Sequence, residues 1–137
     1  MVRNLFVYGT LRSGFRNRYA LLLSRQGVLL GRARVRGRLY DLGSYPALCP
    51  ASGEHWATGE LFALRTPART LAMLDAYEGP DYPRVVTRAL LDDGRTVPAW
   101  VYRYRRALPE WRLLASGEYP SPVAKSPPLR DGAMDRV

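Results

Sequence analysis

The stretch VLLGRARVRGRLYDL, residues Val28–Leu42, alternates apolar and polar side chains over most of its length. Alternation with a period of two is typical of a β-strand that buries one face. We therefore predict one long strand here. Because glycine within a strand often marks a bulge or a bend, the strand is expected to bend at Gly31 or Gly37.

Four arginines share one face of this predicted strand. Arg32, Arg34, Arg36 and Arg38 lie two residues apart, so neighbouring guanidinium groups would stand about 7 Å from each other. The chain has 21 basic and 12 acidic residues, which give a formal net charge of +9. The arginine face is therefore either a solvated surface or a site for an anionic ligand or partner. Because no basic run is interleaved with aromatic residues, we do not expect a nucleic-acid partner.

Further strands and two helices flank the long strand. The last two strands are predicted to form a hairpin, because Asp93-Gly94 supplies the positive φ of a tight turn. Asn17 is expected to cap the first helix, and Thr66 the second. The predicted strands cover residues 5–8, 56–64, 85–91 and 96–104, the helices run from about Arg18 to Arg25 and from Pro67 to Tyr77 or Glu78, a loop covers Gly43–Gly53, and a short helical turn covers Trp111–Ala115.

These elements predict an α+β fold whose sheet closes into a small barrel. The chain has 137 residues, which is within the range of one domain. No apolar run approaches the roughly 20 residues that span a bilayer, and the N-terminus has no signal-peptide pattern, so a cytoplasmic protein is expected. With Cys49 and His55 the only residues of their kinds, we expect no disulfide, no metal site and no cofactor.

Glu78 is the strongest candidate for acid/base chemistry. It lies at the predicted end of a helix, where the helix dipole disfavours a negative charge, and Asp75 lies one turn earlier. Burial against Tyr77 and Tyr82 would raise its pKa further, toward the range of a general base. The alternative is a solvated glutamate at the end of a helix, and position alone leaves both open.

The segment Gly9–Gly14 is rich in glycine but lacks the lysine of a phosphate-binding P-loop. It is either a plain turn after the first strand or a turn whose free N–H groups converge on an anion.

Four motifs follow one another in a fixed order along the chain. They resemble the gamma-glutamylcyclotransferase-like family, also called AIG2-like or BtrG-like, and the resemblance spans about Val2 to Tyr119. We therefore expect one domain over residues 1–119 and a proline-rich tail over residues 120–137. The motifs are VYGTLR at Val7–Arg12, LYDLGSYPAL at Leu39–Leu48, LDAYEG at Leu74–Gly79 and SGEY at Ser116–Tyr119.

The resemblance implies a small mixed β-barrel with flanking helices and a ligand pocket at the edge of the barrel. It also implies an enzyme that cyclises a small γ-glutamyl amine to 5-oxoproline and releases the free amine, with Glu78 as the general acid/base. Tyr119 would form part of the pocket wall, and the YGTL turn would hold the glutamyl group through its backbone. The substrate-binding residues implied in this way are Tyr8, Gly9, Thr10, Leu11 and Tyr119.

The alternative is a protein of the same fold that binds a small anion without turning it over, because a fold does not fix a function. Tyr45 is a further candidate for the pocket wall. Arg84 is expected either to lie at the surface or to pair with Glu78 or with a substrate carboxylate. The sequence leaves the leaving amine and the oligomeric state open.

Overall fold

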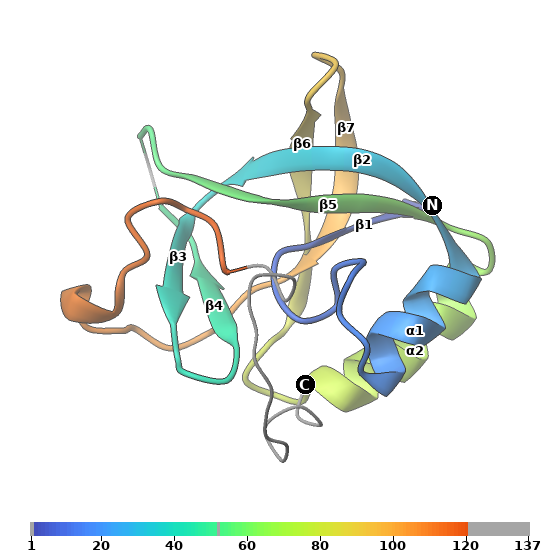
Figure 1. Ribbon diagram of the computed structural model, residues 1–137, viewed down its shortest axis with the longest axis horizontal. Helices are drawn as coiled ribbons and strands as arrows, with labels where there is room; N and C mark the ends of the chain where they lie inside the picture. The colour runs from blue at the N-terminus through green and yellow to red at the C-terminus, as the bar shows by residue number, and fades with distance from the viewer. Residues whose placement is uncertain (1, 52, 121–137) are drawn as a thin grey trace.

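Five strands form a closed barrel in the order β1-β5-β2-β6-β7 (Figure 1). β1 pairs antiparallel with β5 along its whole length, and it pairs parallel with β7 at Leu5 and Trp100, which closes the barrel. The sheet is therefore mixed, and the predicted α+β barrel is confirmed. The barrel strands are β1 (Asn4–Val7), β2 (Gly27–Arg36), β5 (Trp56–Leu64), β6 (Arg84–Leu91) and β7 (Thr96–Tyr102).

The structure is a computed structural model that describes residues 2–51 and 53–120. The proline-rich tail predicted from residue 120 onward lies outside this part of the chain, apart from its first residue. Within these ranges, no helix is long and apolar enough to cross a membrane.

The long strand predicted over Val28–Leu42 is in fact two strands in two different sheets. β2 ends at Arg36, and β3 (Arg38–Asp41) pairs with β4 (Pro46–Cys49) in a separate two-stranded sheet. The break falls at Gly37, which has a φ of 151°, a conformation that side-chain-bearing residues rarely adopt. The predicted bend at Gly37 is confirmed, and a register shift between Leu29 and Gly31 adds a second irregularity.

The prediction of a loop over Gly43–Gly53 was wrong in part, because β4 lies within it. This strand has only four residues and begins with a proline, so it is too short to show the alternation of apolar and polar residues that predicts a strand. Its pairing with β3, with Leu39 opposite Leu48, defines it.

The arginine face of the predicted strand is also divided. Arg32, Arg34 and Arg36 are exposed on β2, whereas Arg38 belongs to β3. Arg34 and Arg36 lie over the ring of Trp56, at 5.1 and 4.7 Å from its centroid, and Arg32 forms ion pairs with two acidic side chains. These three arginines are therefore engaged with the protein's own surface.

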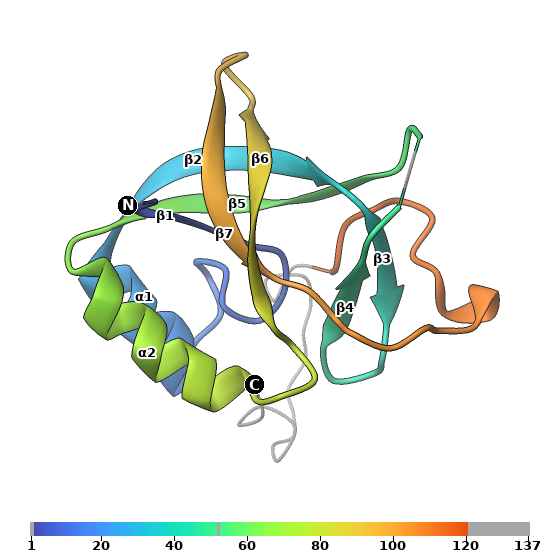
Figure 2. The ribbon, with the colours of Figure 1, turned by 180° about the vertical axis from the view of Figure 1, so that it is seen from behind.

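Both helices lie together at one end of the barrel (Figures 1 and 2). They are α1 (Arg18–Gln26) and α2 (Pro67–Glu78), close to their predicted bounds. The Asn17 side chain caps α1 by accepting from two backbone N–H groups, whereas Thr66 makes no side-chain capping bond. A short 3₁₀ turn, η1 (Glu110–Arg112), begins one residue before the predicted helical turn.

The first strand serves two hydrophobic cores. Phe6 points into the barrel, where it packs with Val35 and Leu61. Leu5 and Val7, on the opposite face of β1, pack against the helices. This arrangement leaves the chain after Val7 at the junction between the barrel end and the helices.

Candidate functional site

Tyr8 follows β1 and anchors the predicted substrate loop. Its side chain is buried, and its hydroxyl donates to the carbonyl oxygen of Tyr102 at 2.6 Å. The same hydroxyl accepts from the N–H of Leu48 at 3.3 Å. Tyr8 therefore joins three segments, the end of β1, the end of β7 and β4, through one oxygen atom.

Gly9 lies against the ring of Pro46 on β4. A Cβ atom at this position would stand 2.7 Å from Cγ and 2.8 Å from Cδ of Pro46, well inside van der Waals contact. Only glycine fits there without moving the hairpin of β3 and β4. The close approach explains the glycine of the YGTL motif by sterics.

The remainder of the loop is held by side chains. The buried Arg12 donates through Nε to the Gly9 carbonyl at 3.0 Å, and through Nη2 to the carbonyls of Tyr119 and Pro120 at 2.9 Å each. The amide of Asn17 donates to the Thr10 carbonyl at 2.7 Å. These bonds fix the carbonyl groups of the loop in place.

The backbone N–H groups of the same loop differ from its carbonyl groups in their hydrogen bonding. Within residues 2–51 and 53–120, the backbone N–H groups of Gly9, Thr10 and Leu11 donate to no acceptor. The Leu11 side chain is buried in the core cluster that contains Leu74 and Tyr77 of α2. The loop therefore lies beside α2 with three consecutive donors unoccupied, as an anion-binding turn requires.

Glu78 is the last residue of α2 and is half-buried. Burial, followed by the negative charge of Asp75, raises its pKa from an ordinary 4.5 to about 7. Among the described residues, its carboxylate has no hydrogen-bond donor and no ion-pair partner. Gly79, with a φ of 83°, ends the helix immediately after it. The site thus contains a glutamate whose carboxylate is available to a ligand.

Asp75 stays ionised beside it. Arg84 donates to the two carboxylate oxygens of Asp75, through Nε at 2.8 Å and Nη2 at 2.9 Å, and the Tyr102 hydroxyl donates to Oδ1 at 2.7 Å. These bonds lower the pKa of Asp75. Arg84 therefore neither pairs with Glu78 nor lies free at the surface, which corrects two of the three expectations for this residue. Pairing with a substrate carboxylate stays a prediction.

The Glu78 carboxylate lies near enough to three tyrosine hydroxyls for its charge to raise their pKa values. Burial is the main cause that raises the pKa values of Tyr8, Tyr82 and Tyr102, and Glu78 contributes to each. Tyr82 also donates to the Pro46 carbonyl at 3.2 Å. Tyr8 and Glu78, which were predicted from distant motifs, are thereby brought together.

Tyr119 lies at the other side of the loop. It is half-buried, packs against the barrel core and donates from its hydroxyl to the Gly43 carbonyl at 3.1 Å. Within residues 2–51 and 53–120, no hydrogen bond joins it to Glu78, and its link to the loop runs through Arg12. The ring of Tyr45 meets that of Tyr82 edge-on, with 6.4 Å between the ring centroids. Tyr45 therefore lies beside a tyrosine whose pKa Glu78 helps to raise.

Sequence reasoning missed two contributors to the site and the partner of a third. Pro46 limits the space at Gly9, Tyr102 binds Asp75, and Arg84 neutralises that same carboxylate. The LDAYEG motif marked Asp75, but only the fold shows that β6 and β7 bring its partners to it. No group of three or more potential metal ligands occurs in the part of the chain that the structure describes.

The arrangement suits proton transfer. A carboxyl group with a pKa near neutrality accepts a proton and returns it with little free-energy cost at physiological pH. Unoccupied N–H groups at a turn bind a carboxylate or a developing oxyanion. The geometry thus places a carboxyl group with a raised pKa and a turn with unoccupied N–H groups at one end of the barrel.

Comparisons with known proteins show which family this chain resembles. A family model described as "Gamma-glutamyl cyclotransferase, AIG2-like" matches residues 5–121. The gamma-glutamylcyclotransferase family protein YtfP of Escherichia coli is 32% identical over 118 residues, which cover 84% of this chain and 94% of that protein.

Solved structures give the same result. An AIG2-like protein from mouse superposes with a TM-score of 0.69 at 27% identity, over 86% of this chain and 88% of that one. YkqA from Bacillus subtilis has a TM-score of 0.68 at 25% identity, and the match covers 87% of this chain but 40% of the longer YkqA chain.

Proposed function

Because the chain belongs to the AIG2-like gamma-glutamyl cyclotransferase family, we propose that it cyclises a small γ-glutamyl amine to 5-oxoproline, with Glu78 as general acid/base. The observation that carries the proposal is the state of Glu78. Its carboxylate is half-buried, has no partner among the described residues and has a pKa of about 7. Perturbed carboxyl groups of this kind are typical of catalytic sites.

The proposed reaction needs one proton carrier. The substrate's α-ammonium group loses a proton to Glu78, and the free amine attacks the γ-carbonyl carbon to form a five-membered ring. The bond between that carbon and the leaving nitrogen then breaks, and Glu78 returns its proton to the leaving nitrogen. The ring nitrogen gives up its second proton, which the released amine takes up to leave as an ammonium ion. The products are 5-oxoproline and the free amine, and Glu78 ends in its starting ionisation state.

The YGTL turn supplies the second part of the proposal. The N–H groups of Gly9, Thr10 and Leu11 would bind the α-carboxylate of the substrate or the oxyanion that forms at the γ-carbonyl. Ring closure within one molecule needs the folded-back conformer above all, so a rigid turn that holds one end of the substrate promotes the reaction. Arg12 and Asn17 make the turn rigid through its carbonyl groups.

The test is release of 5-oxoproline from a panel of γ-glutamyl amines. Wild-type protein should release it, and Glu78→Gln should lower kcat/KM by about 10²- to 10⁴-fold, the range for loss of a general acid/base. Glu54→Gln is a matched control, because Glu54 is an exposed glutamate on a different loop.

Two outcomes would contradict the proposal. Equal release by wild type and Glu78→Gln would mean that another group carries the proton. Binding of γ-glutamyl compounds by both proteins without any release would identify a binding protein of the same fold.

A further inference from the structure

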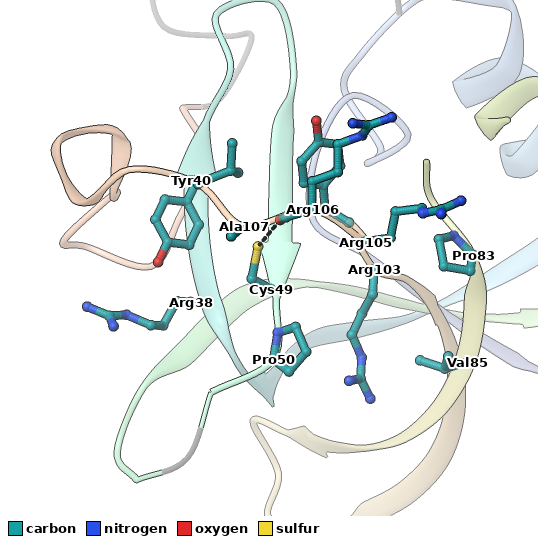
Figure 3. Close-up of a pocket in the computed structure, with 12 residues that line it drawn as sticks. Arg38, Tyr40, Cys49, Pro50, Pro83, Val85, Arg103, Arg105, Arg106 and Ala107 are labelled. Atoms are coloured by element: carbon teal, nitrogen blue, oxygen red, sulfur yellow. Dashed lines mark hydrogen bonds between the residues drawn. The ribbon is translucent and has the colours of Figure 1, made fainter. Parts of the chain in front are cut away.

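A pocket adjoins β4 and includes Cys49 and Pro50 in its lining. It has a volume of about 510 Å³, which is within the range for small-molecule sites, and Glu78 does not line it. It is formed between the β3–β4 hairpin and the segment after β7, with Cys49 at its wall (Figure 3). Next to Cys49 on β4, the backbone N–H of Leu48 donates to the Tyr8 hydroxyl of the Glu78 site.

Arginine is the dominant polar residue of this pocket. Arg38, Arg103, Arg105 and Arg106 line it, and no aspartate or glutamate does. In Figure 3 the side chains of Arg38, Arg103 and Arg105 point in three different directions, away from Cys49. The pocket is therefore lined by arginines whose guanidinium groups lie around it and do not converge on one point.

Two of the four guanidinium groups are not neutralised. Arg38 is paired with Glu110, and Arg106 with Asp81 at 3.2 Å. Within the described ranges, the side chains of Arg103 and Arg105 have neither a hydrogen-bond acceptor nor an ion-pair partner. The pocket thus has an excess of two positive charges over its carboxylate neighbours.

The remaining lining is apolar. Val85, Leu108 and Pro50 contribute aliphatic surface, and Tyr104 contributes an aromatic ring. Guanidinium groups bind carboxylates and phosphates through two parallel hydrogen bonds. An apolar wall beside such groups favours a ligand that has a hydrocarbon body as well as a charge.

We propose that this pocket is a second ligand site, which binds a small organic anion with a phosphate or carboxylate group on an apolar or aromatic body. The charge is bound at Arg103 or at Arg105, and the body packs against the apolar part of the lining. The site is separate from Glu78, and the proposal does not depend on the reaction proposed there. A concave pocket of this size encloses a small molecule and leaves little contact surface for a nucleic acid.

The test is titration of the full ¹⁵N-labelled chain with phenyl phosphate and with benzoate, followed by amide chemical shifts. Saturable shifts are expected at Cys49, Val85 and residues 103–108. Benzyl alcohol, which lacks the charge, and inorganic phosphate, which lacks the apolar body, should both bind more weakly. Comparison of the two aromatic probes shows whether phosphate or carboxylate is preferred.

Variants separate the pocket from the general positive charge of the protein. Arg103→Gln/Arg105→Gln should weaken binding of phenyl phosphate by about tenfold or more, through loss of charge-assisted hydrogen bonds. Arg69→Gln/Arg88→Gln removes the same charge from exposed positions outside the pocket and should change the affinity less than about twofold. Glu78→Gln should bind the probe as wild type does.

Several results would overturn the proposal. These are equal weakening in both double variants, no saturation by either probe, or shifts centred on Gly79 and Tyr82 instead of the pocket. Tighter, salt-sensitive binding of a short single-stranded oligonucleotide would replace it with a nucleic-acid surface. Because the chemical shifts are measured on wild-type protein, the test remains decisive if a variant fails to fold.

Discussion

Arg84 donates two hydrogen bonds to the carboxylate of Asp75, at 2.8 and 2.9 Å. Asp75 lies one helical turn before Glu78 on α2. This pairing divides the roles of the two acidic residues. Asp75 is ionised and structural, and its charge contributes to the raised pKa of Glu78. The ion pair between Arg84 and Asp75 therefore influences the pKa of Glu78.

Asp75→Asn and Arg84→Gln should shift the pH profile of kcat/KM in opposite directions. Glu78 accepts a proton when ionised, so the wild-type profile should rise with pH through about 7. Asp75→Asn removes a negative charge and lowers the pKa of Glu78, moving the rise about one unit toward acid. Arg84→Gln leaves Asp75 unneutralised and moves the rise toward alkali, by about half a unit.

The measurement is 5-oxoproline release between pH 5 and 9 in wild type and both variants. Shifts of opposite sign cannot arise from general loss of structure, which would lower activity at every pH. Shifts of the same sign, or none, would disprove the electrostatic role of the pair.

Glu78→Gln should stabilise the protein at neutral and alkaline pH. The folded state raises the pKa of Glu78 from 4.5 to about 7, so it holds a proton that the unfolded chain has released. Stability is therefore fully present below pH 4.5 and falls as the pH rises toward 7. The variant avoids this loss, by about 1 kcal/mol after allowance for partial exposure, or about 4 °C in Tm.

Thermal unfolding of both proteins between pH 4 and 8 checks this prediction. The difference in Tm should grow from pH 4.5 to 7 and then level off. Glu54→Gln, at an exposed position, should show a constant difference from wild type. A constant difference for Glu78→Gln as well would mean that Glu78 ionises as freely in the folded state as in the unfolded chain.

Gly9→Ala should lower activity, and Pro46→Ala should restore it. The added methyl group would lie 2.7 Å from Pro46 Cγ, so the loop or the hairpin must move and the N–H groups of the turn lose their positions. Pro46→Ala removes Cγ and Cδ, and it keeps the carbonyl that Tyr82 binds. We expect a loss of about tenfold or more in kcat/KM for Gly9→Ala and recovery of most of it in the double variant.

A double-mutant cycle with 5-oxoproline release measures this coupling. Gly27→Ala is a suitable control, because its added Cβ would meet atoms no closer than 3.3 Å, outside the site. Additive losses in the double variant would mean that the contact between Gly9 and Pro46 does not limit the turn.

Local sequence patterns predicted most elements because their signals are themselves local. The strand Trp56–Leu64 matches its prediction, and the caps at Asn17 and Gly79 bound the helices as expected. β4 escaped notice because four residues carry no period. At Gly37, where the chain changes sheet, an added Cβ would lie 2.7 Å from Cδ1 of Leu48. Leu48 is eleven positions away in the sequence, so no local pattern reveals this limit on space.

The candidate site was predictable in its parts but not in its connections. The position of Glu78 at a helix end, with Asp75 one turn before it, indicated a raised pKa, and the structure has burial as the larger cause. The partner of Arg84 could not be predicted, because Asp75 and Glu78 lie only one turn apart on α2 and the position of β6 decides between them. The bond from Tyr8 to Tyr102 likewise depends on closure of the barrel.

That closure has a consequence for synthesis of the chain. The barrel is sealed where β1, near the start, meets β7, about a hundred residues later, at Leu5 and Trp100. A chain that leaves the ribosome from its N-terminus therefore keeps one edge of β1 unpaired until β7 has emerged. Tyr8 and Tyr102 join across this seam, so the surroundings of Glu78 are completed only after β7 has been synthesised.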